Sequence, residues 1–232
     1  MPPLVDPVPS AQQLPNETEV AIIGGGIIGV SAALTLAERG IPVALFEKGH
    51  IAGEQSSRNW GWCRQQGRDP RELPLIIESL ALWRKIHQRT GCDVGFRQCG
   101  ILYLANTPKD VTDREAWLQH GLAYGVESRM VSSKEINDLL PGSNKHWAGG
   151  LYTPTDGRAE PTIAAPAIAR AAQRLGAKIF TNTAVRGVET SGGRISAVVT
   201  ENGSVQCSTV ILAGGAWSST FCRSLDLRLP LL

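Results

Sequence analysis

Apolar and polar residues alternate along this chain in blocks that predict strands and helices in turn. Short apolar runs fall at residues 20–23, 43–46 and 209–213, and a segment with helical periodicity fills residues 27–39. A glycine and a proline follow that segment and would end the helix. Strand, helix and strand in this order predict an α/β fold with a parallel sheet. The run 209–213 is almost continuously apolar, which is typical of a central parallel strand buried on both faces.

The region between the second and third apolar runs predicts shorter elements. They are a helix over 74–89, a strand over 96–105, a helix over 110–124, a short helix after the capping-box pair Ser132 and Glu135, and a strand over 149–153. Residues 160–175 predict a further helix whose regular part begins at Pro166, because proline is tolerated in a first turn. A strand over 178–181 and a hairpin around 191–194 follow. Nothing regular is predicted beyond residue 218.

The segment between the first strand and the first helix is a glycine-rich loop with the pattern GxGxxG. Gly24 would allow a tight turn, Gly26 would let the backbone approach a pyrophosphate, and Gly29 would let the helix pack close to the strand. The N–H groups near Ile27 and Ile28 open the helix and are available to phosphates. The alternative is a glycine-rich turn in an unrelated α/β protein. The flanking strand and helix favour a dinucleotide site.

Glu47 ends the second strand about 20 residues after the loop, where dinucleotide-binding folds place an acid. Its carboxylate would accept hydrogen bonds from a ribose diol. The same charge would repel a 2′-phosphate, so the loop and Glu47 together predict a dinucleotide with a free ribose.

Composition places the chain among ordinary globular proteins. It has 232 residues, of which 42% are hydrophobic and 19% charged, and its net charge is +2. That charge is too small to indicate nucleic acid or an anionic membrane as a partner. Five cysteines without a CxxC pair favour reduced thiols over a zinc site or a disulfide framework. No apolar run is long enough to span a bilayer, and the proline-rich residues 1–17 predict a disordered tail on a cytoplasmic protein.

Four segments together resemble the D-amino-acid-oxidase-like flavoproteins, a family that includes glycine oxidases, sarcosine oxidases, D-amino-acid dehydrogenases and L-amino-acid deaminases. Residues 19–48 resemble the FAD fingerprint of that family, and GEQSSRN at 53–59 resembles the loop around the flavin pyrophosphate. Residues 157–189 and the stretch TVILAGGAWS at 209–218 resemble two later cofactor-domain segments. The resemblance covers residues 19–232.

The resemblance implies cofactor-binding roles for fifteen residues. The pyrophosphate would be bound by Gly24, Gly26, Ile27, Ile28 and Gly29, and the adenosine ribose by Glu47 with Lys48 beside it. Phosphate or ribitol oxygens would accept hydrogen bonds from Gln55, Ser56 and Ser57, and the isoalloxazine would lie near Trp60, Gly61 and Trp62. Val185 would contact the adenine, and Gly214 lies in the segment that returns to the cofactor domain. Alternatively, Ser56 and Ser57 belong to a surface loop without a ligand, and Val185 is an ordinary valine of a strand.

The fold implied is a Rossmann-like FAD-binding domain with an inserted, incomplete α+β substrate domain. The expected divisions are a tail over 1–17, the first part of the FAD-binding domain over 18–92, part of the substrate domain over 93–155, the second part of the FAD-binding domain over 156–220, and a truncated tail over 221–232. Relatives in this family continue past the AGGAWS strand, so the chain resembles their N-terminal part. An incomplete flavin pocket and an open sheet edge or exposed apolar surface are then expected.

The function implied is FAD-dependent oxidation of amino acids or related amines. A hydride would pass from Cα–H to flavin N5, and the imine would then be hydrolysed; no residue is assigned a catalytic role. Some relatives attach flavin through a histidine, and the loop at Trp60 to Cys63 has none close by, so FAD is expected to be noncovalent. The expected partner is a small amino-acid or amine substrate, with no nucleic acid and no membrane span.

Two other functions stay open. The chain is either catalytically incomplete, as a flavin-binding remnant or a subunit that needs a partner chain, or it is a different kind of flavoprotein, such as an NAD(P)H-using reductase or a tRNA-modifying protein. The last two are disfavoured, because the sequence has no second GxGxxG and no basic face for nucleic acid.

Overall fold

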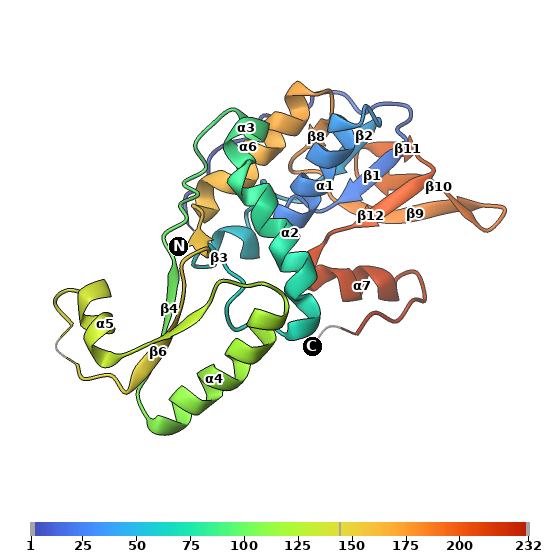
Figure 1. Ribbon diagram of the computed structural model, residues 1–232. Helices are drawn as coiled ribbons and strands as arrows, with labels where there is room; N and C mark the ends of the chain where they lie inside the picture. The colour runs from blue at the N-terminus through green and yellow to red at the C-terminus, as the bar shows by residue number, and fades with distance from the viewer. Residues whose placement is uncertain (1–2, 144, 231–232) are drawn as a thin grey trace. The chain divides into compact units, whose positions relative to one another are not determined.

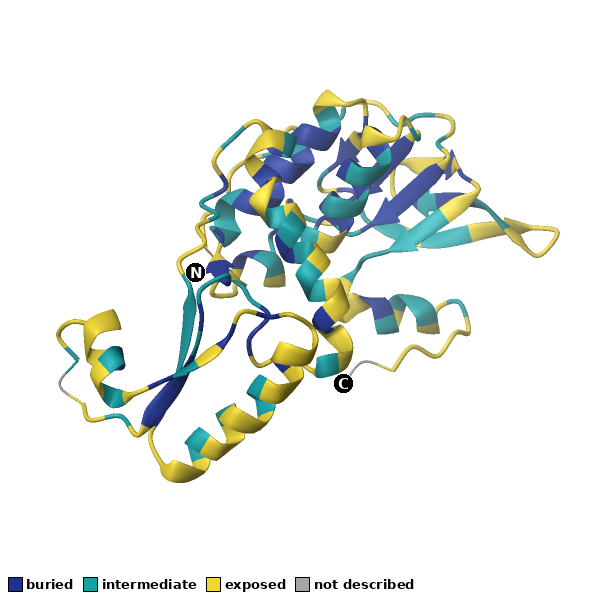
Figure 2. Ribbon diagram, in the orientation of Figure 1, coloured by how far each residue is buried: buried dark blue, intermediate teal, exposed yellow. Residues whose placement is uncertain are grey.

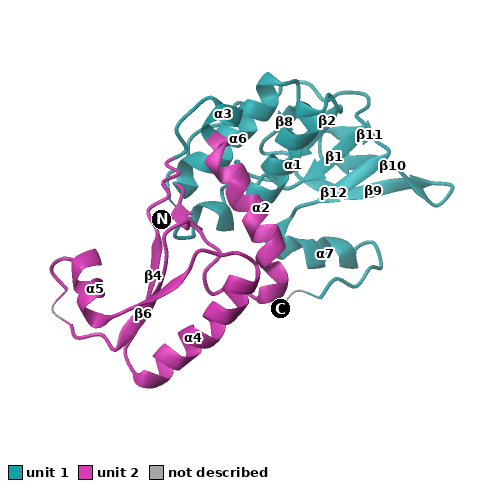
Figure 3. Ribbon diagram, viewed as in Figure 1, with its two compact units in different colours: residues 1–60, 87–94, 160–232 teal, residues 61–86, 95–159 magenta. Residues whose placement is uncertain are grey.

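The structure is a computed structural model that describes residues 3–143 and 145–230 (Figure 1). It divides into two compact units (Figure 3): unit 1 comprises residues 1–60, 87–94 and 160–232, and unit 2 comprises residues 61–86 and 95–159. Residues 1, 2, 231 and 232, which belong to the two predicted tails, lie outside the described residues.

A four-stranded parallel sheet forms the centre of unit 1. Its order is β12 (Thr209–Leu212), β1 (Val20–Ile23), β2 (Val43–Phe46) and β8 (Lys178–Phe180). All four residues of β1 and all four of β2 are buried, which accounts for their unbroken apolar sequence (Figure 2). The predicted α/β class with a parallel sheet is therefore confirmed.

Two layers cover this sheet. Helices α1 (Ile27–Glu38) and α6 (Pro161–Arg174) pack against each other on one side. An antiparallel sheet in the order β11-β10-β9 contributes Val198 and Val205 to a core that also contains Ala44, Phe46 and Phe180. Its strands are β9 (Val185–Ser191), β10 (Arg194–Thr200) and β11 (Gly203–Gln206). The predicted hairpin is present, with Gly192 and Gly193 at φ +59° and +73°.

Unit 2 is built on a three-stranded antiparallel sheet in the order β4-β6-β5. Its elements are β3 (Trp62–Cys63), α2 (Leu73–Arg84), β4 (Ile101–Ala105), α4 (Pro108–Ala123), β5 (Arg129–Val131), α5 (Ser133–Leu139), β6 (Gly149–Thr153) and β7 (Gly157–Arg158). The predicted capping box is confirmed at α5, where Ser132 and Glu135 hydrogen-bond each other's backbone N–H groups.

The remaining elements are short. They are the 3-10 turns η1 (Gln55–Ser57), η2 (Pro70–Glu72) and η3 (Gly215–Trp217), and the helices α3 (Ile86–Thr90) and α7 (Ser218–Arg223). Helix α7 was not predicted, because six residues are too few to show a helical period. No helix among residues 3–143 and 145–230 is long and apolar enough to cross a membrane.

The segment over residues 3–17 is ordered, which corrects the predicted disordered tail. The Ala11 N–H donates to the Ile179 carbonyl at 2.8 Å, and the Ser10 hydroxyl accepts from the Thr181 N–H at 3.1 Å. These bonds lie along the side of β8 that does not pair with β2. Ala11 and Leu14 also pack against the core.

Pro166 lies inside helix α6 rather than in its first turn, because the helix begins five residues earlier at Pro161. A proline inside a helix cannot donate to the carbonyl four residues before it, which here belongs to Thr162. That carbonyl accepts instead from the N–H of Asp6 at 3.2 Å. The N-terminal segment thus supplies a donor for the carbonyl that Pro166 leaves without its usual partner in the helix.

Three further elements differ from prediction. The expected helix over 74–89 is broken at Lys85 into α2 and α3. The strand expected over 96–105 begins at Ile101, because Gly100 turns the chain with φ +74°. The strand expected at the centre of the sheet, β12, is an edge strand with half-buried side chains, since no strand of the described residues pairs with its outer side.

The compact units also differ from the predicted domain bounds. Residues 61–86, expected in the FAD-binding domain, belong to unit 2, as do residues 156–159. The reason is the pairing of β3 with β7, together with Asp156, whose carboxylate accepts from the backbone N–H groups of Gln65 and Gln66 at 2.8 and 3.0 Å. The assignment of the units as FAD-binding and substrate domains stays a prediction.

Candidate functional site

A cavity of about 750 Å³ lies in unit 1 beyond the carboxyl ends of β1, β2 and β12. Ligands of open α/β sheets bind at this end of the strands. Ten of the predicted site residues line it: Gly24, Gly26, Ile27, Ile28, Glu47, Lys48, Gln55, Ser56, Val185 and Gly214. Segments far apart in the sequence therefore meet around one space, as the dinucleotide interpretation requires.

Two glycines of the loop, Gly24 and Gly29, have the geometric roles that their spacing predicted. Gly24 has φ +112°, a conformation that favours glycine, and a Cβ there would lie 2.4 Å from the carbonyl oxygen of Ala213. A Cβ on Gly29 would lie 1.9 Å from the carbonyl oxygen of Gly24. The first turn of α1 can approach β1 and β12 only because both side chains are absent.

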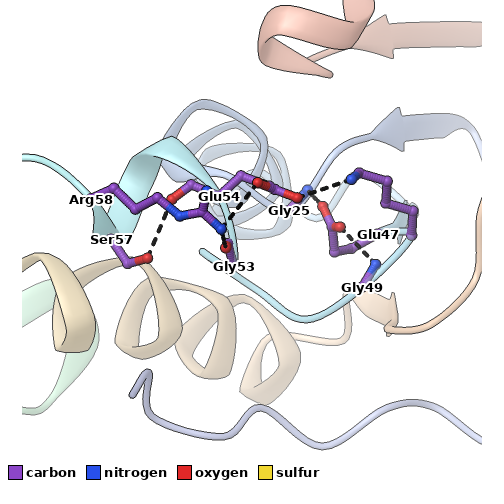
Figure 4. A network of polar contacts seen from close by, with 8 residues as sticks. Gly25, Glu47, Gly49, Gly53, Glu54, Ser57 and Arg58 are labelled. Atoms are coloured by element: carbon purple, nitrogen blue, oxygen red, sulfur yellow. Dashed lines mark hydrogen bonds and ion pairs between the residues drawn. The ribbon is translucent and has the colours of Figure 1, made fainter. Parts of the chain in front are cut away.

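Glu47 is buried at the end of β2 with 9% of its surface exposed, and its carboxylate is fixed by two backbone donors. The Gly25 N–H donates to Oε2 at 2.7 Å, and the Gly49 N–H donates to Oε1 at 2.8 Å (Figure 4). A carboxylate oxygen can accept more than one hydrogen bond, so acceptor capacity remains toward the cavity. The backbone orients the charge before any ligand arrives.

Gly25 is a site residue that the sequence analysis missed. A Cβ on Gly25 would lie 2.5 Å from Cδ1 of Ile51 and 2.9 Å from Cβ of Glu47. The GxGxxG pattern leaves this position unspecified, so only the third consecutive glycine hinted at it. Its role depends on Glu47, 22 residues away.

Ser56 lies at the N-terminus of α1, where its Oγ accepts from the Ile27 N–H at 2.9 Å. A Cβ on Gly26 would lie 3.1 Å from the same oxygen. The hydroxyl thus occupies a position where a helix N-terminus favours a negatively charged oxygen such as that of a phosphate. Ser57 differs: its buried hydroxyl donates to the Glu54 carbonyl within the loop, and it does not line the cavity.

The loop that carries Ser56 is tied together by charges. Glu54 accepts from Lys48 Nζ at 3.0 Å and pairs with Arg58 Nη2 at 3.4 Å. Arg58 also donates to the Gly53 carbonyl at 3.1 Å (Figure 4). The Lys48 ammonium lowers the pKa of Glu54 chiefly through that hydrogen bond, so the carboxylate stays ionised at neutral pH.

Five predicted residues are absent from the cavity lining: Gly29 and Ser57, described above, and three residues of the segment 60–62. Trp60 belongs to unit 1 and is 81% exposed. Gly61 and Trp62 belong to unit 2, where the Gly61 carbonyl accepts from Ala159 N–H at 2.8 Å and the Trp62 ring lies 6.1 Å from that of Tyr103. Their proximity to a flavin ring stays a prediction.

The part of the cavity wall after β12 was only partly foreseen. Trp217 in η3 and Phe221 in α7 line it together with Ala213 and Gly215, and Arg186 lines it beside Val185. Within the AGGAWS stretch only Gly214 was predicted at the site, and Trp217 was not. Nothing in the sequence pointed to Phe221, because its helix was not predicted.

A glycine turn at the start of α1, a buried carboxylate at the end of β2 and a cavity between them define a dinucleotide-binding domain of the Rossmann type. The profile of the family described as FAD dependent oxidoreductase (DAO) matches residues 19–232. The chain belongs to this family of FAD-dependent flavoproteins, as its resemblance predicted.

Individual relatives agree. Mitochondrial sarcosine dehydrogenase of Mus musculus is 30% identical over 236 residues, which is 98% of this chain and 26% of that protein. Glycine oxidase of Geobacillus kaustophilus (strain HTA426) is 30% identical over 91% of this chain and 58% of its own length. The structure of L-amino acid deaminase from Proteus myxofaciens superposes with a TM-score of 0.94 and 35% identity, covering 98% of this chain and 52% of that one. The chain thus spans between a quarter and three-fifths of these relatives.

Proposed function

We propose that this chain binds FAD noncovalently in the cavity of unit 1. Glu47 would hold the adenosine ribose, and the N-terminus of α1 with Gly26 and Ser56 would hold the pyrophosphate. The observation that carries the proposal is the buried Glu47 carboxylate, fixed by Gly25 and Gly49 and lining the cavity that begins at the glycine loop. A negative charge at this position disfavours a 2′-phosphate, which supports FAD over NADP.

We further propose that the chain belongs to an oxidoreductase that acts on amino acids or related amines. The names of the sarcosine, glycine and L-amino-acid enzymes among its relatives support this class of substrate. When bound, the flavin supplies a two-electron acceptor for the Cα–H hydride of the amine, and the imine product hydrolyses. The part of this chemistry that falls to unit 1 is to orient the cofactor and to keep a fixed carboxylate at its ribose.

Attachment of the flavin through Cys63 is disfavoured by the surroundings of its thiol. Burial, with a contribution from the negative charge of Asp156, raises the pKa of Cys63 to about 12. Because the thiolate is the reactive form of cysteine, this side chain is a poor nucleophile at neutral pH. It donates instead to the Gly61 carbonyl at 3.7 Å.

The test is an absorbance spectrum and a melting curve of the purified 232-residue chain with and without added FAD. We expect a flavin spectrum and a rise in melting temperature with FAD, because a ligand that binds the folded state stabilises it. The variant Glu47→Gln should show a smaller rise at the same FAD concentration, whereas Glu19→Gln, an exposed acid beside β1, should show the full rise. No flavin spectrum and no FAD-dependent shift would refute the proposal.

A panel of amino acids and amines, assayed under air and with a quinone, then tests the substrate class. Dye or oxygen reduction with some member of the panel supports the oxidoreductase proposal. FAD binding without turnover of any member would favour the alternative, a flavin-binding chain that is catalytically incomplete or needs a partner subunit.

A further inference from the structure

Lys48 joins two separate segments of the cavity wall. Its Nζ lies 3.0 Å from Oε1 of Glu54, in the loop after β2, and 3.9 Å from the centre of the Trp217 ring, in η3 after β12. All three residues belong to unit 1 and all three line the cavity. One ammonium group therefore connects the loop at residues 48–58 with the turn at residues 214–217 across this space.

The contacts are of a strength suited to opening and closing. The side chains of Lys48 and Glu54 are 46% and 39% exposed, and Trp217 is 45% exposed. Exposed ion pairs and exposed cation–π contacts each contribute weakly to stability, so thermal motion breaks them often. Glu54 also pairs with Arg58 Nη2 at 3.4 Å, so its carboxylate keeps one ion pair when the contact with Lys48 breaks.

Both partners of Lys48 belong to the protein, and they lie in different segments of the cavity wall. A connection between two walls of a cavity must open for a large ligand to enter and again for it to leave.

We propose that Lys48, between Glu54 and Trp217, is a clasp that limits how fast the dinucleotide enters and leaves the cavity. The inference rests on the proposed function, because it names FAD as the ligand that passes. Breaking the clasp raises the population of the open cavity and so speeds both directions of exchange.

The experiment measures FAD association and dissociation by stopped-flow flavin fluorescence, with the full chain and the variants Lys48→Met, Trp217→Leu and Glu54→Gln. Lys48→Met removes the charge and keeps an apolar stem. We expect the association rate and the dissociation rate both to rise by about three- to tenfold in each single variant. The double variant Lys48→Met, Trp217→Leu should exchange FAD about as fast as the faster single variant, because both break the same contact.

Lys178→Met is the matched control, since Lys178 is exposed on β8 and does not line the cavity. It should leave both rates unchanged. A faster dissociation with an unchanged association rate would make Lys48 an ordinary ligand contact and overturn the clasp, as would unchanged rates in all variants. Absence of FAD binding by the unmutated chain would overturn the proposed function itself, and the clasp with it.

Discussion

Units 1 and 2 each contain a buried carboxylate that accepts from two backbone N–H groups, yet the two serve different ends. Glu47 in unit 1 accepts from Gly25 and Gly49 and lines the cavity. Asp156 in unit 2 is fully buried and accepts from Gln65 and Gln66, and it does not line that cavity.

The surroundings of each carboxylate decide its use. Asp156 has no exposed surface, and burial raises its pKa despite its hydrogen bonds. Its carboxylate also accepts a third hydrogen bond, from Gln65 Nε2 at 3.2 Å, so its partners are groups of the protein itself. Glu47 keeps capacity toward a space that a ligand can fill. The same hydrogen-bond arrangement is therefore structural where it is sealed and is suited to binding where it faces a cavity.

The largest effect is expected for Asp156→Ala in unit 2. The substitution leaves the N–H groups of Gln65 and Gln66 buried without an acceptor, which costs about 2–5 kcal/mol in total. Urea unfolding measures the loss, and hydrogen exchange at residues 61–69 shows whether it is local. Asp138→Ala, an exposed acid in α5, should stay within about 0.5 kcal/mol of the unmutated chain. Equal losses in both variants would mean that Asp156 does not hold this loop.

Gly25→Ala should displace Glu47 without removing it. The new Cβ would lie 2.5 Å from Ile51 Cδ1 and 2.9 Å from Glu47 Cβ, and such overpacking costs about 1–3 kcal/mol. We expect lower stability by urea unfolding and weaker FAD binding by fluorescence titration. Gly187→Ala is the control, because a Cβ there meets nothing within 4 Å. Unchanged FAD affinity in Gly25→Ala would mean that FAD binding does not depend on where the Glu47 side chain lies.

Glu47→Gln keeps the shape of the side chain but turns one acceptor oxygen into an NH2 donor. One of the two N–H groups at Gly25 and Gly49 then loses its partner, and the ribose loses a charged acceptor. We expect FAD affinity to fall about tenfold, which is about 1.4 kcal/mol, as measured by fluorescence titration against Glu19→Gln. Weakening of both variants to the same extent would contradict a specific role for Glu47.

The smallest expected effect is a pH dependence of stability that comes from the buried carboxyl group of Asp156. The pKa of folded Asp156 is raised above its unfolded value, so its protonated form contributes stability that is fully present below pH 3.8 and is lost as pH rises through the folded pKa. Asp156→Asn does not titrate. We therefore expect the stability of the unmutated chain relative to this variant to decline as pH rises through that window, measured by urea unfolding at several pH values. A relative stability that rises with pH would contradict the raised pKa.

The sequence predicted the cavity-lining carboxylate of Glu47 better than the fully buried carboxylate of Asp156. Glu47 follows its glycine loop at a fixed offset, and every part of that pattern has a local physical reason. Asp156 lies 91 residues from Gln65, and no periodicity links the two. The same holds for Asp6 and Thr162, and for the edge position of β12, which depends on which strands pair rather than on its own apolar residues. Contacts between distant segments are decided by packing that one sequence does not reveal.

The bonds between the N-terminal segment and β8 bear on how copies of this protein behave toward each other. Ser10 and Ala11 hydrogen-bond the backbone of Thr181 and Ile179 at the outer edge of β8. The Asp6 N–H donates to the Thr162 carbonyl, which Pro166 cannot pair in α6. Loss of this segment would expose a bare strand edge beside apolar side chains, which is a template for pairing with another chain. A variant without residues 3–17 is therefore expected to self-associate more readily than the unmutated chain, and light scattering at several concentrations measures this.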